Sequence, residues 1–144
     1  MSINLSRYTV IYVLAIAILM ALSVALETFA NIEMPTGVST VLPVMMAAML
    51  EGQRIARETK QPLESSDAWK SALAATGIVI VVSILLVAAF LVFAPGFAGL
   101  FAALGSVGLM ILVAISLVVV LLTNRFALSM GAKNELKAQA KRNA

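Results

Sequence analysis

The chain has 144 residues, of which 62% are hydrophobic and only 12% are charged, and its formal net charge at neutral pH is +3. Soluble domains are roughly 45–50% apolar and about 25% charged, so a water-soluble fold of this size could not cover so much apolar surface. The sequence contains no cysteine and no histidine. This composition excludes disulfides, thiolates, imidazole bases and the common ligands of zinc, haem and iron–sulfur clusters, and we expect neither a metal nor a cofactor.

The apolar residues fall into runs of about 20, the length that crosses roughly 30 Å of hydrocarbon as a helix. We therefore predict one membrane domain over 1–144, an all-α integral membrane four-helix bundle. Its first span covers about 9–29. A cleaved signal peptide is the alternative, but the apolar run exceeds the roughly 7–15 residues of a signal h-region, which favours an uncleaved anchor.

The second predicted span, about 38–55, has the weakest pattern. It is short, contains Pro43, and carries Glu51 and Arg54 near its end. We interpret it as a full crossing, with a re-entrant half-helix as the alternative. A polar cytoplasmic loop over 56–70 follows, in which serines and Asp67 are suited to capping the next helix.

The third span is predicted over 71–93 and the fourth over 99–123, with a turn at Pro95 and Gly96 between them. Trp69 and Lys70 precede the third span, and an aromatic ring with a snorkelling cation is typical of the headgroup level. A basic cytoplasmic tail over 126–144 completes the chain. Anionic lipid is an expected partner of this tail, and nucleic acid is not, because no aromatic or glycine pattern accompanies the charge.

The positions of the cations predict the orientation. All ten lysines and arginines fall on one side of this plan: one precedes the first span, four lie within 54–70 and five within 125–142. Short loops rich in lysine and arginine stay in the cytoplasm. We therefore expect the bacterial inner (plasma) membrane, with both termini cytoplasmic (N-in/C-in).

Glu51 is the polar residue of greatest interest, because a charged group inside the hydrocarbon costs about 2.5–3.5 kcal/mol on insertion scales. Arg54 is three residues further along the same helix face, and Arg125 ends the fourth span at a similar depth. The favoured interpretation is a buried polar group of Glu51, Arg54 and Arg125. The alternatives are a carboxylate that couples to a proton or cation, or a helix that starts nearer Pro35 and leaves Glu51 among the headgroups.

Other residues have simpler interpretations. Glu27, Trp69 and Lys70 are predicted to be interfacial, and three methionines of the second span (45, 46 and 49) to be flexible packing rather than metal ligands. Small residues recur at four-residue spacing, which lets membrane helices approach closely, and we expect most of this packing to be within the chain. The predicted packing residues are Ala17, Ala21, Ala25, Ala48, Gly52, Gly99 and Ala103.

Two stretches carry a resemblance to a known family. One is Leu42-Pro43 followed by Ala47-Ala48 and Glu51-Gly52-Gln53-Arg54, and the other is Trp69 followed by Ala72. They resemble a family of small four-span bacterial inner-membrane proteins, hypothetical proteins of Acinetobacter and other proteobacteria. The resemblance implies the four-helix plan and no activity.

With no histidine, no cysteine and no aspartate inside any span, the sequence does not favour an enzyme. We predict a non-catalytic membrane protein that acts through helix–helix association, as a homo-oligomer or as an accessory or assembly subunit of a larger membrane complex. The alternative is a small oligomeric transporter or channel with Glu51 in its pathway.

Overall fold

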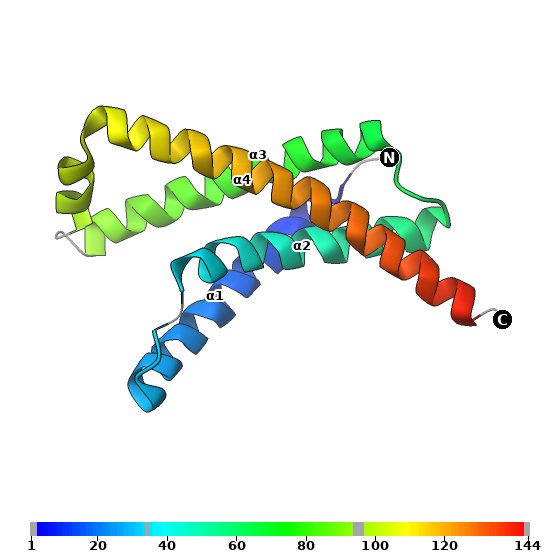
Figure 1. Ribbon diagram of the computed structural model, residues 1–144, viewed down its shortest axis with the longest axis horizontal. Coiled ribbons are helices and arrows are strands. Elements are labelled where there is room, and N and C mark those ends of the chain that lie inside the picture. Colours follow the sequence, from blue (N-terminus) through cyan, green and yellow to red (C-terminus); the bar gives the residue numbers. More distant parts are fainter. Residues whose placement is uncertain (1–2, 34, 94–96, 143–144) are drawn as a thin grey trace.

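The computed structural model of the protein describes residues 3–33, 35–93 and 97–142, without the side chains of 36, 38, 39, 97, 98, 100 and 101. These residues form an all-helical fold, which confirms the predicted fold class at that level. Four helices follow one another along the chain (Figure 1): α1 (Leu5–Ala30), α2 (Thr36–Thr59), α3 (Ser65–Phe93) and α4 (Phe97–Arg142).

The helices extend beyond the predicted spans, since α2 continues to Thr59 and α3 begins at Ser65. The connection between them is therefore shorter than the predicted loop. The predicted tail is also not a separate coil, because α4 continues through it to Arg142. The predicted turn at Pro95 and Gly96 lies outside the described residues.

Local signals set several helix ends. The Asn4 side chain caps α1 by accepting the Arg7 backbone N–H at 3.1 Å. Asn31 and Lys60 end α1 and α2 in the left-handed conformation, with φ of 50° and 53°. Gly105 interrupts α4 with φ of 66° and ψ of 172°, a conformation that glycine adopts without strain.

Among the described residues, three helices are long and apolar enough to cross a membrane: α1, α3 and α4 from residue 102 on. The second helix does not qualify by composition, because its last turns carry Glu51, Arg54, Arg57 and Glu58. Three of the four predicted spans therefore coincide with helices of membrane-crossing character.

The four helices form two hairpins, α1 with α2 and α3 with α4, which cross and then diverge (Figure 1). The most extensive contact is between α2 and α4. We call the region where all four helices meet, around residues 3–8, 51–76 and 124–142, the charged end. The diverging parts of the hairpins, residues 13–33 with the start of α2 and residues 80–93 with 97–119, are the apolar arms.

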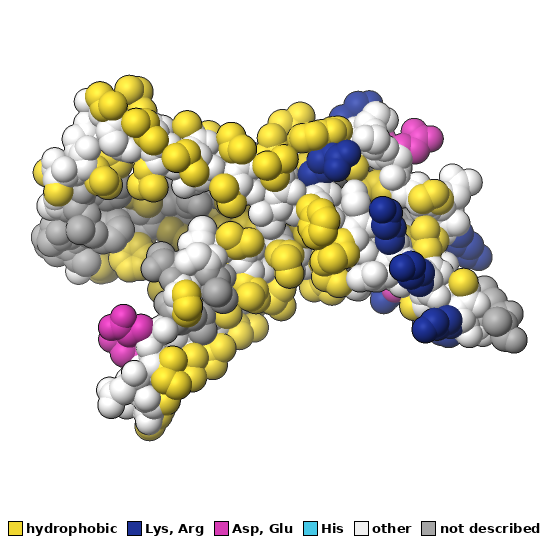
Figure 2. All heavy atoms as spheres, in the orientation of Figure 1, with side chains coloured by type: hydrophobic (Ala, Val, Ile, Leu, Met, Phe, Trp, Pro, Cys, Tyr) yellow, Lys and Arg dark blue, Asp and Glu magenta, His cyan; other side chains and the backbone are white. Residues whose placement is uncertain are grey.

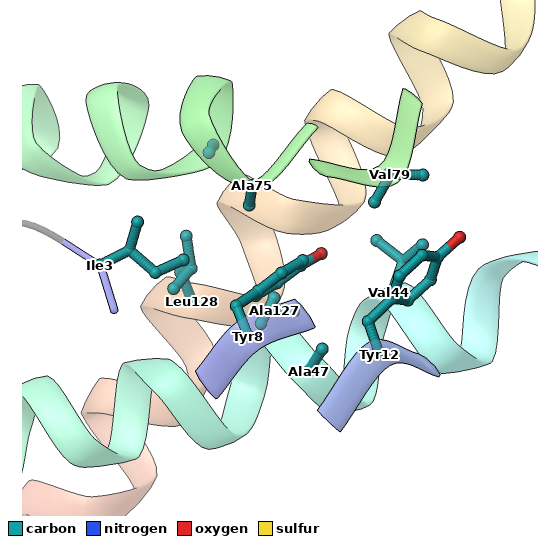
Figure 3. Close-up of a cluster of buried hydrophobic side chains, with 11 residues drawn as sticks. Ile3, Tyr8, Tyr12, Val44, Ala47, Ala75, Val79, Ala127 and Leu128 are labelled. Carbon is teal, nitrogen blue, oxygen red and sulfur yellow. The ribbon is translucent and has the colours of Figure 1, made fainter. Parts of the chain in front are cut away.

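The buried core lies where the hairpins cross (Figure 3). Tyr8 and Tyr12 of α1 stack with ring centroids 6.2 Å apart. Around them, small side chains allow the helix backbones to approach closely. The buried apolar residues of this cluster come from every helix and from the segment before α1: Ile3, Tyr8, Tyr12, Val44, Ala47, Ala48, Ala72, Ala75, Val79, Ala127 and Leu128.

The apolar arms bury far less. In the most apolar 18-residue window of α1 and of α3, 11% of the residues are buried, and in that of α4 none are. Large apolar side chains such as Ile18, Ile84 and Met110 are more than half exposed. Exposed apolar surfaces of this extent are typical of helices that contact lipid or another membrane helix.

Candidate functional site

Two glycines bring α2 and α4 into backbone contact at the centre of the charged end. A Cβ atom on Gly52 would lie 2.2 Å from the carbonyl oxygen of Leu128, and one on Gly131 would lie 2.1 Å from that of Met49. Real Cβ atoms do not come this close to backbone oxygen, so any side chain at either position would force the helices apart. The contact is reciprocal, since each helix presents a glycine to the backbone of the other.

Beside this crossing, the fully buried Glu51 carboxylate is held by two arginines. Its Oε2 accepts from Arg54 Nε at 3.0 Å and from the Asn4 backbone N–H at 3.4 Å. Its Oε1 lies 3.3 Å from Arg7 Nε. Arg54 also pairs with Glu58 at 2.8 Å, so two acids and two arginines balance one another. Among the described residues Oε1 accepts no hydrogen bond, so the two arginines and the bonds to Oε2 are what make this buried charge tolerable.

The predicted group of Glu51, Arg54 and Arg125 needs a correction. The structure brings Glu51 and Arg54 together, but Arg125 lies elsewhere, with its guanidinium carbon 4.7 Å from the centre of the Trp69 ring. Its Nη2 donates to Ser65 Oγ at 3.2 Å. Arg125 follows the apolar part of α4 on the side that faces α3, and the second partner of Glu51 is instead Arg7, from the first turn of α1.

These contacts also show how far along the helices Glu51 lies. Because Asn4 and Arg7 reach it, Glu51 is level with the start of α1 and not midway along the apolar segment. Helix α2 begins at Thr36, beside Pro35, which agrees with the alternative of an earlier helix start.

A second buried polar group joins three helices. Tyr8 of α1 donates its hydroxyl to Asn124 Oδ1 at 2.7 Å, and Asn124 Nδ2 of α4 donates to Thr76 Oγ1 of α3 at 3.2 Å. Thr76 in turn donates to the Ala72 backbone carbonyl at 2.8 Å. Tyr8, Asn124 and Thr76 thus each donate to an acceptor within this series of hydrogen bonds, as buried polar groups require. The sequence interpretation missed this network, although an asparagine and a tyrosine at the ends of apolar runs were the available signal.

The far part of α4 is tied to α2 by a third acid. Glu135 Oε1 lies 3.0 Å from Arg57 Nε and 3.1 Å from Arg142 Nη2, and Glu135 also accepts from Gln139. The hydrogen bond from Arg57, with the charges of Arg57 and Arg142, lowers the pKa of Glu135 below its ordinary value. The same pairing raises the pKa of Arg57. The predicted tail is therefore a docked helix at this point.

The basic residues gather at the charged end. Arg7 and Arg54 meet at Glu51, Arg57 and Arg142 meet at Glu135, and Arg125 contacts the start of α3. In the view of Figure 2, the lysines and arginines lie over the right half of the molecule, whereas apolar side chains are seen on both halves. This arrangement agrees with the predicted clustering of cations on one side.

The predicted packing residues divide into two groups. Ala48 and Gly52 are buried in the crossing, so this pair packs within the chain. The others are exposed or half-buried: Ala17, Ala21, Ala25, Gly99 and Ala103. The expectation that most of these residues pack within the chain therefore does not hold for the arms, because the hairpins diverge there.

Among the predicted interfacial residues, Glu27 and Lys70 are exposed, and Trp69 is 39% exposed beneath the Arg125 guanidinium. The methionine side chains at 45 and 49 pack against the core, and Met46 is exposed. Within the part of the chain that the structure describes, no three acidic, histidine or cysteine side chains are placed to hold a metal ion.

The polar contacts of the charged end join the helices to one another. The buried acids Glu51 and Glu135 are each paired with arginines, and the buried hydroxyls of Tyr8 and Thr76 donate to other protein groups. In comparisons with models of protein families, with curated proteins and with solved structures, the chain has no match.

Proposed function

We propose that the protein is a non-catalytic integral membrane protein of the bacterial inner membrane that works by helix–helix association. In this proposal it crosses the membrane four times with both termini in the cytoplasm. It acts as a homo-oligomer or as an accessory or assembly subunit of a larger membrane complex. The resemblance to small four-span bacterial membrane proteins belongs to the same proposal.

The observation that carries the proposal is the exposure of the apolar arms. A self-contained helix bundle buries a stripe of every helix, whereas the most apolar window of α4 buries none of its residues. The exposed surface includes small residues, such as Ala17 and Ala21 on α1 and Ala103 on α4. In membranes such residues let a second helix approach closely.

The gap between the hairpins adds a second support. A hollow of about 250 Å³ lies between the first half of α2 and residues 115–123 of α4, and Ser116 and Thr123 line it among mostly apolar side chains. Hydroxyl groups in such positions hydrogen-bond across membrane helices. A helix from a second subunit would find both apolar contact and polar partners there.

Four crossings are supported by the placement of α2. It packs against both α1 and α4, so it does not need to be apolar on every face. It also ends at the charged end, where α1 begins. One full crossing by each helix returns the chain to the side on which it started.

Cross-linking tests the proposal. The chain has no cysteine, so single cysteines at Ala17 or Ala103 would report on the arms, with Ala138→Cys at the exposed tail as the matched control. We expect disulfide-linked dimers, or adducts to one membrane partner, from the arm positions in oxidised membranes, and none from the control. A clean monomer from mild detergent, together with no cross-link at either arm position, would contradict association.

The alternative, a small oligomeric transporter or channel, requires Glu51 in a pathway. Its enclosure by Arg7 and Arg54 does not support that role. Liposome flux that falls in Glu51→Gln while the fold is retained would favour the transporter over the association proposal.

A further inference from the structure

A groove at the charged end has the character of an anion site. It has a volume of about 450 Å³ and lies between the last third of α4 and the connection that leads into α3. Among the described residues, no acid lines it, and Glu64 and Asp67 line a separate hollow next to α2. Its polar lining consists of Arg125, Lys133, Lys137, Ser65, Ser129 and Asn134.

Arg125 is held in place at the groove before any ligand arrives. Trp69 supports its guanidinium at 4.7 Å, and Ser65 accepts one of its N–H groups. Its Nε is buried and has no hydrogen-bond partner among the described residues. A guanidinium has five N–H donors in a planar fork that fits phosphate oxygens. Only Nη2 of the two terminal nitrogens has a hydrogen-bond partner among the described residues, so the guanidinium has a terminal donor left for an anion and loses little side-chain freedom by binding one.

An apolar stripe leads from the groove along α4. Phe126 lines the groove and is 65% exposed, and the same helix face continues through Leu122, Val118 and Ile115, each more than half exposed. From residue 115 to residue 126 the helix rises about 16 Å at 1.5 Å per residue. This length matches about half of the roughly 30 Å hydrocarbon core, which is the depth of one leaflet.

We propose that this groove binds one anionic phospholipid. Its phosphate lies among Arg125, Lys133 and Lys137, with the hydroxyls of Ser65 and Ser129 as further partners, and one acyl chain follows the stripe from Phe126 to Ile115. The proposal rests on charge complementarity, because three cations without an acid favour a net negative headgroup over a zwitterionic one. It does not depend on the proposed association of the arms.

Trp69 provides the test, because it is the single tryptophan of the chain and contacts Arg125. The full-length protein is placed in nanodiscs of equal parts phosphatidylglycerol and phosphatidylcholine, with brominated acyl chains on one lipid or the other. Bromine quenches tryptophan fluorescence only at short range. We expect an apparent preference for brominated phosphatidylglycerol on the order of tenfold.

Two double variants distinguish a site from general attraction. Lys133→Gln with Lys137→Gln removes two groove cations, and Lys60→Gln with Lys141→Gln removes two others from the same end, so both have the same net charge. We expect the groove variant to lose most of the preference and the control to keep it. Equal quenching by both lipids in the unmodified protein, or an equal loss in both variants, would overturn the proposal.

All four lysines are exposed, so both variants are expected to fold, and circular dichroism checks this. If the groove variant does not fold, Lys133→Gln alone makes the same test against Lys141→Gln, with a smaller expected loss.

Discussion

The charged end and the apolar arms of this protein are both built from apolar helices, yet only the charged end holds them together. There the helices contact through glycines, alanines and three sets of buried polar contacts. In the arms, which also carry small residues such as Ala17 and Ala103, almost none of the side chains are buried. In lipid, apolar side chains gain little by meeting one another, so close backbone contact and hydrogen bonds decide where helices associate.

The largest effect is expected from adding a methyl group at the point where the backbones of α2 and α4 are in contact. Gly131→Ala would place a methyl group against the Met49 carbonyl and push α4 from α2, with a loss of about 2–3 kcal/mol in the free energy of unfolding. Unfolding in mixed micelles, followed by circular dichroism, measures this. The matched control is Gly77→Ala in α3, where nothing lies within 4 Å of the added atom. Equal stability of the two variants would show that the close approach is not important.

The next effect concerns the buried acid. Glu51→Gln leaves Arg7 and Arg54 without their shared anion, and we expect a loss of about 2 kcal/mol, less than for a fully buried pair because Arg7 is half exposed. Glu58→Gln removes the exposed partner of Arg54 and should change stability by less than about 0.5 kcal/mol. The same unfolding assay compares them. A Glu51→Gln protein as stable as the Glu58→Gln protein would argue against a structural role for this carboxylate.

A smaller effect is expected for the hydroxyl that links α1 to α4. Tyr8→Phe removes the donor to Asn124 and should cost about 1 kcal/mol. Thr9→Val removes a neighbouring hydroxyl that only bonds to its own helix and should be close to neutral. If both substitutions change the free energy of unfolding equally, the hydrogen bond from Tyr8 to Asn124 contributes no more than one within a single helix.

The smallest effect is a dependence on pH. Glu135 has a lowered pKa in the folded chain, so its ion pairs stabilise the protein above the ordinary pKa of about 4.3. This contribution is lost as the pH falls through the lowered pKa. We expect the thermal midpoint to fall more between pH 5 and pH 3 in the unmodified protein than in Arg57→Gln, which lacks the main partner. Parallel curves would contradict a contribution from Glu135.

The parts of this fold that the sequence predicts are the long apolar helices. Long apolar runs must become helices because the hydrocarbon offers no partner for the backbone, and three such runs coincide with helices of membrane-crossing length. The pair of Glu51 and Arg54 was also predictable, since residues three apart share a helix face. Contacts of this local kind need no knowledge of how the hairpins cross.

Contacts between distant segments could not be predicted in the same way. Asn4 and Glu51 are 47 residues apart, and nothing in their local sequence says that α1 starts beside the end of α2. The sequence places Arg125 and Glu51 at a similar depth, which suggests a contact between them. It does not show in which direction around α4 the Arg125 side chain points, and this side chain faces Trp69. Gly131 escaped notice because it lies among the charges of the predicted tail, although Ala127 precedes it by four residues.

The reciprocal glycine contact also bears on the order of events during synthesis. The glycine of α4 and the acid that binds Arg57 both lie near the carboxyl terminus, and 78 residues separate Arg57 from Glu135. The first hairpin can therefore form its own ion pairs, of Glu51 with Arg7 and Arg54, but Arg57 has no acid from α4 until Glu135 has been synthesised. A nascent chain halted before residue 126 would contain three complete helices and the Tyr8–Asn124 hydrogen bond, but it would lack both the Gly131 contact and the Glu135 ion pairs.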